Sequence, residues 1–185
     1  MSPPLRSGQT VLLVDGYNIL MAWPSLQKTA RESTFDLARR ELMEELSGYV
    51  AFWDYQATII FDAYGQATPV HHEKSVSGID IIFTGFGETA DTYIERTCAQ
   101  LQWADCRVRV ATSDRIQQLV VGGYDAEWLS ADQLKTEVRH AKQQIRRAIR
   151  ARKVKKDRGI HSFLDANTLE QLNQWRIQGR DPRIT

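Results

Sequence analysis

Four short apolar runs recur along the chain, and polar residues follow each of them. The runs lie at residues 10–14, 57–61, 79–83 and 107–111. They are rich in Val, Ile and Leu and mostly lack alternation with polar residues, which is typical of strands buried on both faces of a parallel sheet. Residues 127–129 are a candidate for a further strand.

Helical spacing of apolar residues separates these runs. Ser33 and Asp36 are spaced like a capping box, and apolar residues then recur up to Trp53. Further helices are predicted from Thr89, directly after Asp114, and over a long segment that starts at Ser130. Because strands alternate with helices, the sequence predicts an α/β domain of three layers with a central parallel sheet.

The domain organisation follows from these elements. Residues 8–130 are expected to form the sheet domain, and residues 131–178 a basic helix that ends at Gly159 and an amphipathic segment that docks afterwards; residues 179–185 are a polar tail. The 185 residues are 42% hydrophobic, which suffices for one ordinary core.

Nothing in the composition indicates a membrane or an exported protein. No apolar run approaches the roughly 20 residues that a membrane span needs, and the first residues lack the apolar segment of a signal peptide. Cys98 and Cys106 are the two cysteines and are expected to be reduced packing residues. We therefore expect a cytoplasmic protein without a membrane partner.

Charge is distributed unevenly although the net charge is only +1. Residues 139–158 contain ten Lys or Arg and one acid, Asp157. Such a basic arm beside an acidic body suits the binding of a polyanion such as RNA, and the alternative is a solvated helix face. The predicted RNA-binding residues are Arg139, Lys142, Arg146, Arg147, Arg150, Arg152, Lys153, Lys155 and Lys156.

Aspartates follow the predicted strands. Asp15, Asp62 and Asp114 come directly after or near the ends of strands, and Asp91 lies in the first turn of the helix entered from the third strand. Ligands gather outside the carboxyl ends of parallel strands, so these four residues are the candidate catalytic acids. Each one alone has an ordinary alternative as a turn residue or a helix cap.

A cluster of carboxylates predicts a bound divalent cation, because the like charges repel each other until a cation relieves them. Oxygen ligands favour Mg²⁺ or Mn²⁺ over zinc, and we expect Asp15, Asp91 and Asp114 to be the metal ligands. Metal ions at such a site activate water and stabilise the leaving oxygen in phosphodiester hydrolysis. The predicted activity is therefore metal-dependent hydrolysis of phosphodiester bonds.

Polar neighbours of the acids are candidates for supporting roles. Asn18 lies one turn beyond Asp15, and Glu88 lies three residues before Asp91; both are included in the catalytic set. Thr112 and Ser113 are candidates to donate a hydroxyl to a phosphate group. Turn and cap roles are the alternative for Asn18, Thr112 and Ser113.

The aromatic residues and histidines give further predictions. Trp53 and Trp103 are expected in the core, whereas Trp23 and Tyr17 are candidates for stacking an RNA base beside Asp15. The histidine pair at residues 71–72 is expected in a polar loop without a ligand role.

Several stretches carry a resemblance to a known family. They are Leu12 to Asn18, Ala22 to Pro24, Phe61 to Ala63, Ile82 to Thr84, Glu88 to Asp91 with Ile94 and Glu95, and Val110 to Asp114. Over about 100 residues, in the same order, they resemble the YacP-like branch of the NYN-domain ribonucleases, relatives of the PIN-domain nucleases. The segment from Val70 to Ile79 and the loop 85–87 have no match in that resemblance.

The resemblance implies a PIN-like fold and endonucleolytic cleavage of RNA, with Asp15, Asp62, Asp91 and Asp114 in the acidic positions. It also implies that the RNA is single-stranded or messenger RNA and that the ribosome is a partner.

Other functions stay open at this point. Residues 85–90 fit a dinucleotide fingerprint, but Glu88 and Asp91 would repel a pyrophosphate there. An aspartyl phosphatase would need a second acid where Tyr17 stands. A non-catalytic RNA- or ribosome-binding protein with a degenerate nuclease fold is the main alternative, and the residues alone do not distinguish RNA from DNA as the substrate.

Overall fold

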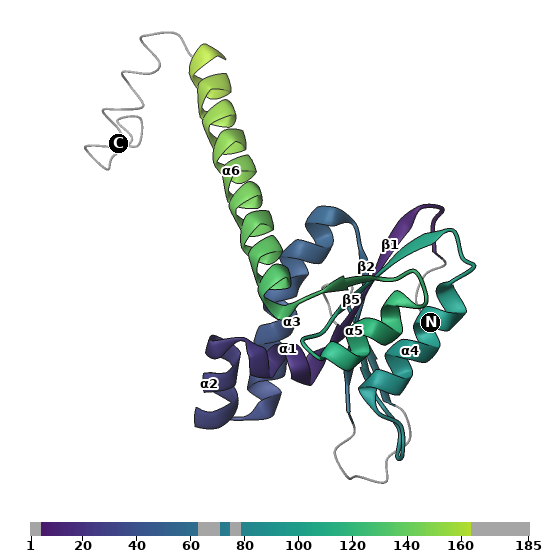
Figure 1. The fold of residues 1–185 in the computed structure, drawn as a ribbon. Coiled ribbons are helices and arrows are strands. Elements are labelled where there is room, and N and C mark those ends of the chain that lie inside the picture. Colours follow the sequence, from purple (N-terminus) through teal and green to yellow (C-terminus); the bar gives the residue numbers. More distant parts are fainter. Residues whose placement is uncertain (1–4, 63–70, 75–78, 164–185) are drawn as a thin grey trace. The chain divides into compact units, whose positions relative to one another are not determined.

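The structure is a computed structural model that describes residues 5–62, 71–74 and 79–163, with residues 71–74 and 153–163 described by backbone alone (Figure 1). The chain divides into two units, Met1–Lys142 and Gln143–Thr185. The first unit contains the sheet and the helices packed on it. The described part of the second unit consists of the continuing helix α6 (Ala131–Phe163), whose first turns belong to the first unit.

A six-stranded sheet lies at the centre of the first unit. Its strands are β1 (Gln9–Asp15), β2 (Gln56–Phe61), β3 (His71–Lys74), β4 (Asp80–Phe83), β5 (Cys106–Ala111) and β6 (Glu127–Leu129). They are ordered β3-β4-β2-β1-β5-β6, and all neighbours are parallel except β3 and β4. The central parallel sheet predicted from the apolar runs is confirmed, including the short strand at residues 127–129.

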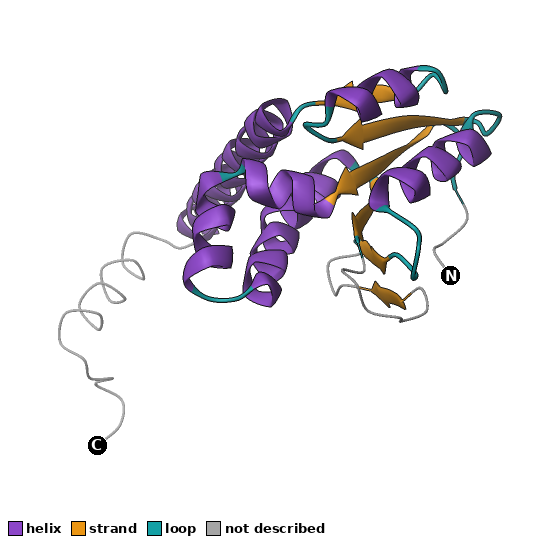
Figure 2. Ribbon diagram, turned by 60° about the horizontal axis from the view of Figure 1, so that its bottom comes forward, coloured by secondary structure: helices purple, strands orange, loops and turns teal. Residues whose placement is uncertain are grey.

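Helices cover both faces of this sheet (Figure 2). One face packs against α1 (Gly16–Ala22), α2 (Pro24–Glu32), α3 (Phe35–Trp53) and the start of α6, and the other packs against α4 (Ala90–Leu101) and α5 (Arg115–Gly122). Successive side chains of β1 point to opposite faces of the sheet. Leu12 lies in the core on the α1–α3 face and Leu13 in the core on the α4–α5 face, and both are buried. This explains why the strand is apolar throughout, and it confirms the three-layer architecture.

Several local predictions were wrong. The side chain of Thr34, and not that of Ser33, caps α3 by accepting a hydrogen bond from Leu37 N at 3.1 Å. Helix α6 continues through Gly159. Residues 71–72 lie in strand β3 and not in a loop. The expected docking segment after residue 163 lies outside the described residues.

In the described part of the chain, no helix is long and apolar enough to span a membrane. The second unit begins within the basic run, where the side chains of Arg146, Arg147 and Arg150 are exposed. Arg139 is also exposed, and Lys142 forms an ion pair with Glu45 inside the first unit. Lys153, Lys155 and Lys156 lie on α6, where only the backbone is described.

Candidate active site

Asp15 lies where strand β1 passes into helix α1. It is the last residue of the strand and the N-cap of the helix, and its carboxylate accepts a hydrogen bond from Asn18 N at 3.0 Å. Only 8% of the residue is exposed. The following turn depends on Gly16, because a Cβ atom there would collide with the ring of Phe61 on the neighbouring strand.

The end of strand β2 holds the start of helix α4. Asp62 follows β2, and its Oδ1 accepts a short hydrogen bond from Ala90 N, the first residue of α4. Asp91 is the next residue, in the first turn of that helix, and it is exposed. A contact across 28 residues therefore brings Asp62 and Asp91 to the same edge of the sheet.

The third part of the edge is the turn from strand β5 into helix α5. Asp114 caps α5, with its Oδ1 accepting hydrogen bonds from Ile116 N at 2.7 Å and Gln117 N at 3.3 Å. The hydroxyl of Thr112 accepts a hydrogen bond from Asp114 N at 3.0 Å, and Thr112 is fully buried. In this structure Thr112 therefore fixes the position of Asp114, whereas Ser113 is exposed.

Asn18 joins two of these turns. Its amide oxygen accepts a hydrogen bond from Ser113 N at 2.7 Å, across 95 residues of sequence. Its backbone N–H donates to Asp15 at the same time. Asn18 thus holds the β1 and β5 ends together, which is a positioning role that its place one turn beyond Asp15 did not reveal.

The four aspartates interact electrostatically. Burial raises the pKa of Asp15 from 3.8 to about 6, the hydrogen bond from Asn18 N opposes that rise, and the charges of Asp91, Asp62 and Asp114 add to it. The pKa of Asp91 is also raised, first by the partial desolvation of its carboxylate, although the residue as a whole is exposed, and then by the charges of Asp114 and Asp62. The structure therefore brings together the four acids that were predicted from the strand ends.

The donor set fits a hard divalent cation in its chemistry. Carboxylate oxygens are the ligands that Mg²⁺ and Mn²⁺ prefer, and a cation would relieve the repulsion that raises the pKa of Asp15. Within the described residues, however, no three His, Cys, Asp or Glu side chains are placed so that they could together hold one metal ion. Asp62 and Asp114 are occupied with backbone N–H groups of α4 and α5 instead.

The two glutamates near Asp91 have other contacts. Glu88 forms an ion pair with Arg96 of α4, and Glu95 accepts a hydrogen bond from the hydroxyl of Tyr124 at 3.0 Å. The charges that raise the pKa values of Asp15 and Asp91 come from aspartates, and Glu88, which was predicted in the catalytic set, is paired with Arg96 instead.

The prediction that Trp23 stacks on a base beside Asp15 was wrong, whereas Tyr17 is partly exposed. Trp23 is 2% exposed, and its indole N–H donates a hydrogen bond to Ala131 O at 3.0 Å, so its ring is not accessible to a base. The ring of Tyr17 lies 5.0 Å from that of Phe61, and its hydroxyl accepts a hydrogen bond from Arg39. Trp53 and Trp103, which were both expected in the core, are instead 47% and 90% exposed.

A mostly parallel sheet with helices on both faces and four interacting aspartates at its carboxyl edge defines a nuclease-like α/β domain. The chain belongs to the YacP-like NYN domain family, whose model matches residues 12–177. Divalent metals are typical of nucleases of the NYN and PIN-like class. The resemblance and the PIN-like fold expected from the sequence are thus confirmed.

One relative, YacP of Bacillus subtilis, matches both in sequence and in two crystal structures. The chain is 31% identical over 166 residues to the protein YacP, which carries the description "uncharacterized"; the match covers 90% of this chain and 96% of that protein. The crystal structure of Rae1 (YacP) has a TM-score of 0.67 at 31% identity and covers 90% of this chain and 94% of that one. A mutant of Rae1 matches with a TM-score of 0.64 at 32% identity, over 76% of this chain and 81% of that one.

Proposed function

We propose that this protein is a metal-dependent endoribonuclease that hydrolyses phosphodiester bonds of single-stranded or messenger RNA in the cytoplasm. The observation that carries the proposal is the electrostatic coupling of Asp15, Asp62, Asp91 and Asp114 at one edge of the sheet. Four neighbouring carboxylates repel each other and destabilise the fold, and binding of a cation together with an anionic substrate would relieve this repulsion. Membership of the NYN family supports the nuclease class.

Asp15, Asp91 and Asp114 are the proposed ligands of Mg²⁺ or Mn²⁺, and their side chains would have to move closer together around the cation, because no three such side chains of the described residues are placed to hold one ion. The bound cation would supply an activated water and neutralise charge on the phosphate. Asp15 contributes a buried carboxylate that the Asn18 N–H orients. The hydroxyl of Thr112 accepts a hydrogen bond from Asp114 N, so the backbone of Asp114 is held at this edge of the sheet.

The remaining acids and polar groups have supporting roles in this proposal. Asp62 anchors the first turn of α4 through Ala90 N and adds negative charge beside Asp91. Ser113, which is exposed and adjacent to Asp114, is the group that could donate a hydroxyl to the phosphate. Glu88 stays in the proposed catalytic set, with the provision that its ion pair with Arg96 must open first.

The basic residues of α6 are the proposed contacts to the RNA backbone. Arg146, Arg147 and Arg150 are exposed and close in sequence, and paired cations of this kind neutralise successive phosphates. Binding of the ribosome, whose surface is largely RNA, would use the same chemistry. In this proposal the aspartates cleave the RNA and the basic residues of α6 bind its phosphates.

The substitution Asp91→Asn tests the site. It keeps the size and shape of the side chain but removes the charge that a cation needs, so cleavage of a single-stranded RNA should fall about a thousandfold while RNA affinity is retained. Glu95→Gln is the matched control, because Glu95 lies one turn further along α4 and accepts a hydrogen bond from Tyr124. Its rate should change little.

Two results would contradict the proposal. Near-normal cleavage by the Asp91→Asn variant would place the active site elsewhere, and full activity in EDTA would remove the metal. If wild-type protein binds RNA without cleaving it at any concentration of Mg²⁺ or Mn²⁺, the non-catalytic RNA-binding alternative is the correct one. A DNA strand of the same sequence should be run in parallel to determine the preferred sugar.

A further inference from the structure

A cavity of about 550 Å³ lies in the first unit, away from the aspartates. Its lining includes Thr10 and Arg107, which stand near the starts of β1 and β5, whereas Asp15 and Asp114 stand at or beyond the ends of these strands. Five residues of strand separate Thr10 from Asp15, which corresponds to roughly 16 Å. Its volume is within the range of about 300–1,000 Å³ of small-molecule sites.

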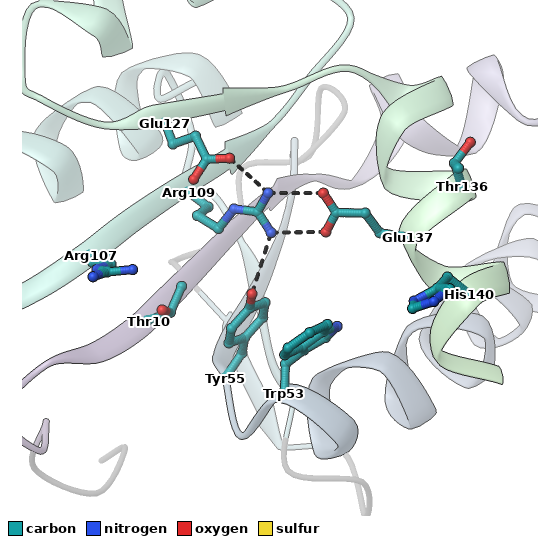
Figure 3. Close-up of a pocket in the computed structure, with 9 residues that line it drawn as sticks. All are labelled: Thr10, Trp53, Tyr55, Arg107, Arg109, Glu127, Thr136, Glu137 and His140. Carbon is teal, nitrogen blue, oxygen red and sulfur yellow. Dashed lines mark hydrogen bonds and ion pairs between the residues drawn. The ribbon is translucent and has the colours of Figure 1, made fainter. Parts of the chain in front are cut away.

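One wall of this cavity is a preformed ion-pair network (Figure 3). The guanidinium of Arg109 makes two hydrogen bonds of 3.0 Å to the carboxylate of Glu137 and one of 2.8 Å to Glu127. The hydroxyl of Tyr49 donates to the same Glu137 carboxylate at 2.6 Å. The side chain of Arg109 is 10% exposed, and its buried Nε has no hydrogen-bond partner among the described residues.

The facing wall is aromatic. Helix α3 ends at Trp53, and the left-handed backbone of Asp54 (φ 55°) turns the chain so that the rings of Trp53 and Tyr55 lie parallel, at 18° and 6.4 Å between centroids. Figure 3 shows these rings side by side, with the hydroxyl of Tyr55 accepting a hydrogen bond of 3.5 Å from Arg109. Trp53 is 47% exposed, which is unusual for an indole that has a hydrophobic core beside it.

The polar groups around the rings are of both signs. Arg107 is exposed at the rim, the side chain of Glu127 is 62% exposed, and the hydroxyl-bearing Thr10 and Thr136 also line the cavity. These groups match a ligand that has a flat ring, hydrogen-bond donors and acceptors on the edge of the ring, and an attached anion. The ring would stack on the indole, its edge would contact the carboxylate and the hydroxyls, and the anion would pair with Arg107.

We propose that this cavity is a nucleotide-binding site, in which the base stacks on Trp53 and the phosphate pairs with Arg107. The nucleotide comes either from a strand of RNA or from a free mononucleotide, since both present a base and a phosphate. The site is distinct from the acidic edge, and the proposal holds whether or not the aspartates cleave RNA.

Binding in EDTA tests the proposal, because chelation of the metal prevents cleavage under the proposed function. If the proposed function is wrong, the binding result is still valid. Equilibrium dialysis would measure the affinity of the full chain for AMP, GMP, CMP and UMP, for adenosine, and for a short single-stranded RNA. Trp53→Ala should weaken binding about 5- to 100-fold, the range expected when a base loses its stacking partner. Trp53→Phe keeps a ring and should retain most of the affinity.

Two further variants make the result specific. Trp103→Ala is the matched control, because this tryptophan is 90% exposed and does not line the cavity; its affinities should equal those of the wild type. Arg107→Gln should weaken the binding of AMP but not that of adenosine, which lacks the phosphate. Thermal unfolding of each variant shows whether it is folded, and the Arg107→Gln comparison stands even if Trp53→Ala does not fold.

The outcomes separate the two sources. Trp53-dependent binding of mononucleotides assigns the cavity to a free nucleotide, and Trp53-dependent binding of the RNA alone assigns it to a strand of RNA. The proposal is overturned if neither ligand binds in a way that depends on Trp53 and Arg107, or if Trp103→Ala weakens binding as much as Trp53→Ala does.

Discussion

The buried carboxylate of Asp15 should make the metal-free protein less stable as the pH rises from about 4 to 6. Its pKa in the folded protein is raised to about 6 from 3.8, mainly by burial and also by the charges of Asp91, Asp62 and Asp114. Below pH 4 the group is protonated in both the folded and the unfolded chain and has no effect. Above pH 6 it is ionised in both, and the folded state bears the full unfavourable energy.

The substitution Asp15→Asn should remove this penalty. A rise of the pKa from 3.8 to about 6 corresponds to about 3 kcal/mol, so above pH 6 the variant should be more stable by as much as about 3 kcal/mol. The amide oxygen can still accept the hydrogen bond from Asn18 N, so the cap of α1 is retained. Near pH 4 the two proteins should differ little.

Urea unfolding followed by circular dichroism at pH 4, 5, 6 and 7, always in EDTA, would measure the free energy of unfolding of both proteins. EDTA is essential because a bound cation would offset the penalty. Asp125→Asn is the control: Asp125 is exposed and has a left-handed backbone (φ 59°), which asparagine also adopts readily. Its difference from the wild type should not change with pH. If Asp15→Asn shows the same pH dependence as the wild type, Asp15 is not buried with a raised pKa.

Three further predictions concern packing and charge. Gly16→Ala should destabilise the fold by about 1–3 kcal/mol in the same urea assay, because its methyl group collides with the ring of Phe61; an unchanged free energy of unfolding would mean that Gly16 and Phe61 are not this close. Arg109→Met should lower the free energy of unfolding by about 2–3 kcal/mol, because Glu137 is left beside Glu127 without a cation, and an effect below about 0.5 kcal/mol would refute the network. Charge reversal at Arg146, Arg147 and Arg150 of α6 should weaken RNA binding. The slope of the log binding constant against the log salt concentration should become shallower by about 0.7 for each phosphate that the protein no longer neutralises. An unchanged slope would show that these residues form only a solvated helix face.

The amino-acid sequence by itself determined the layers and the acidic edge. Continuous apolar runs and helical spacing are local patterns, and each one fixes its element from neighbouring residues alone. Once the strands are parallel, their carboxyl ends lie at one edge, so residues such as Asp15, Asp62 and Asp114 are brought together by topology. This is why the four acids could be predicted before any tertiary interaction was known.

Only the tertiary structure decided which polar groups pair with each other. Asn18 bonds to Ser113 across 95 residues, and Arg109 pairs with Glu137 across 28. Neither pair has a pattern in the sequence, because the partners belong to different elements and meet only when the sheet and helices have packed. The edge strand β3 was missed for a related reason: its four polar residues, His71–Lys74, lack the apolar run that marks a central strand.

The tryptophans show the same limit. Trp23 and Trp53 both lie at the end of a helix, yet the first is 2% exposed and the second 47% exposed. Trp23 is covered because the start of α6 crosses it and Ala131 O accepts its N–H; Trp53 lies at the last turn of α3, where no element covers the ring within the described residues. Hydrophobicity determines that an indole prefers burial, but the packing of distant elements determines which indole is buried and which one lines a cavity.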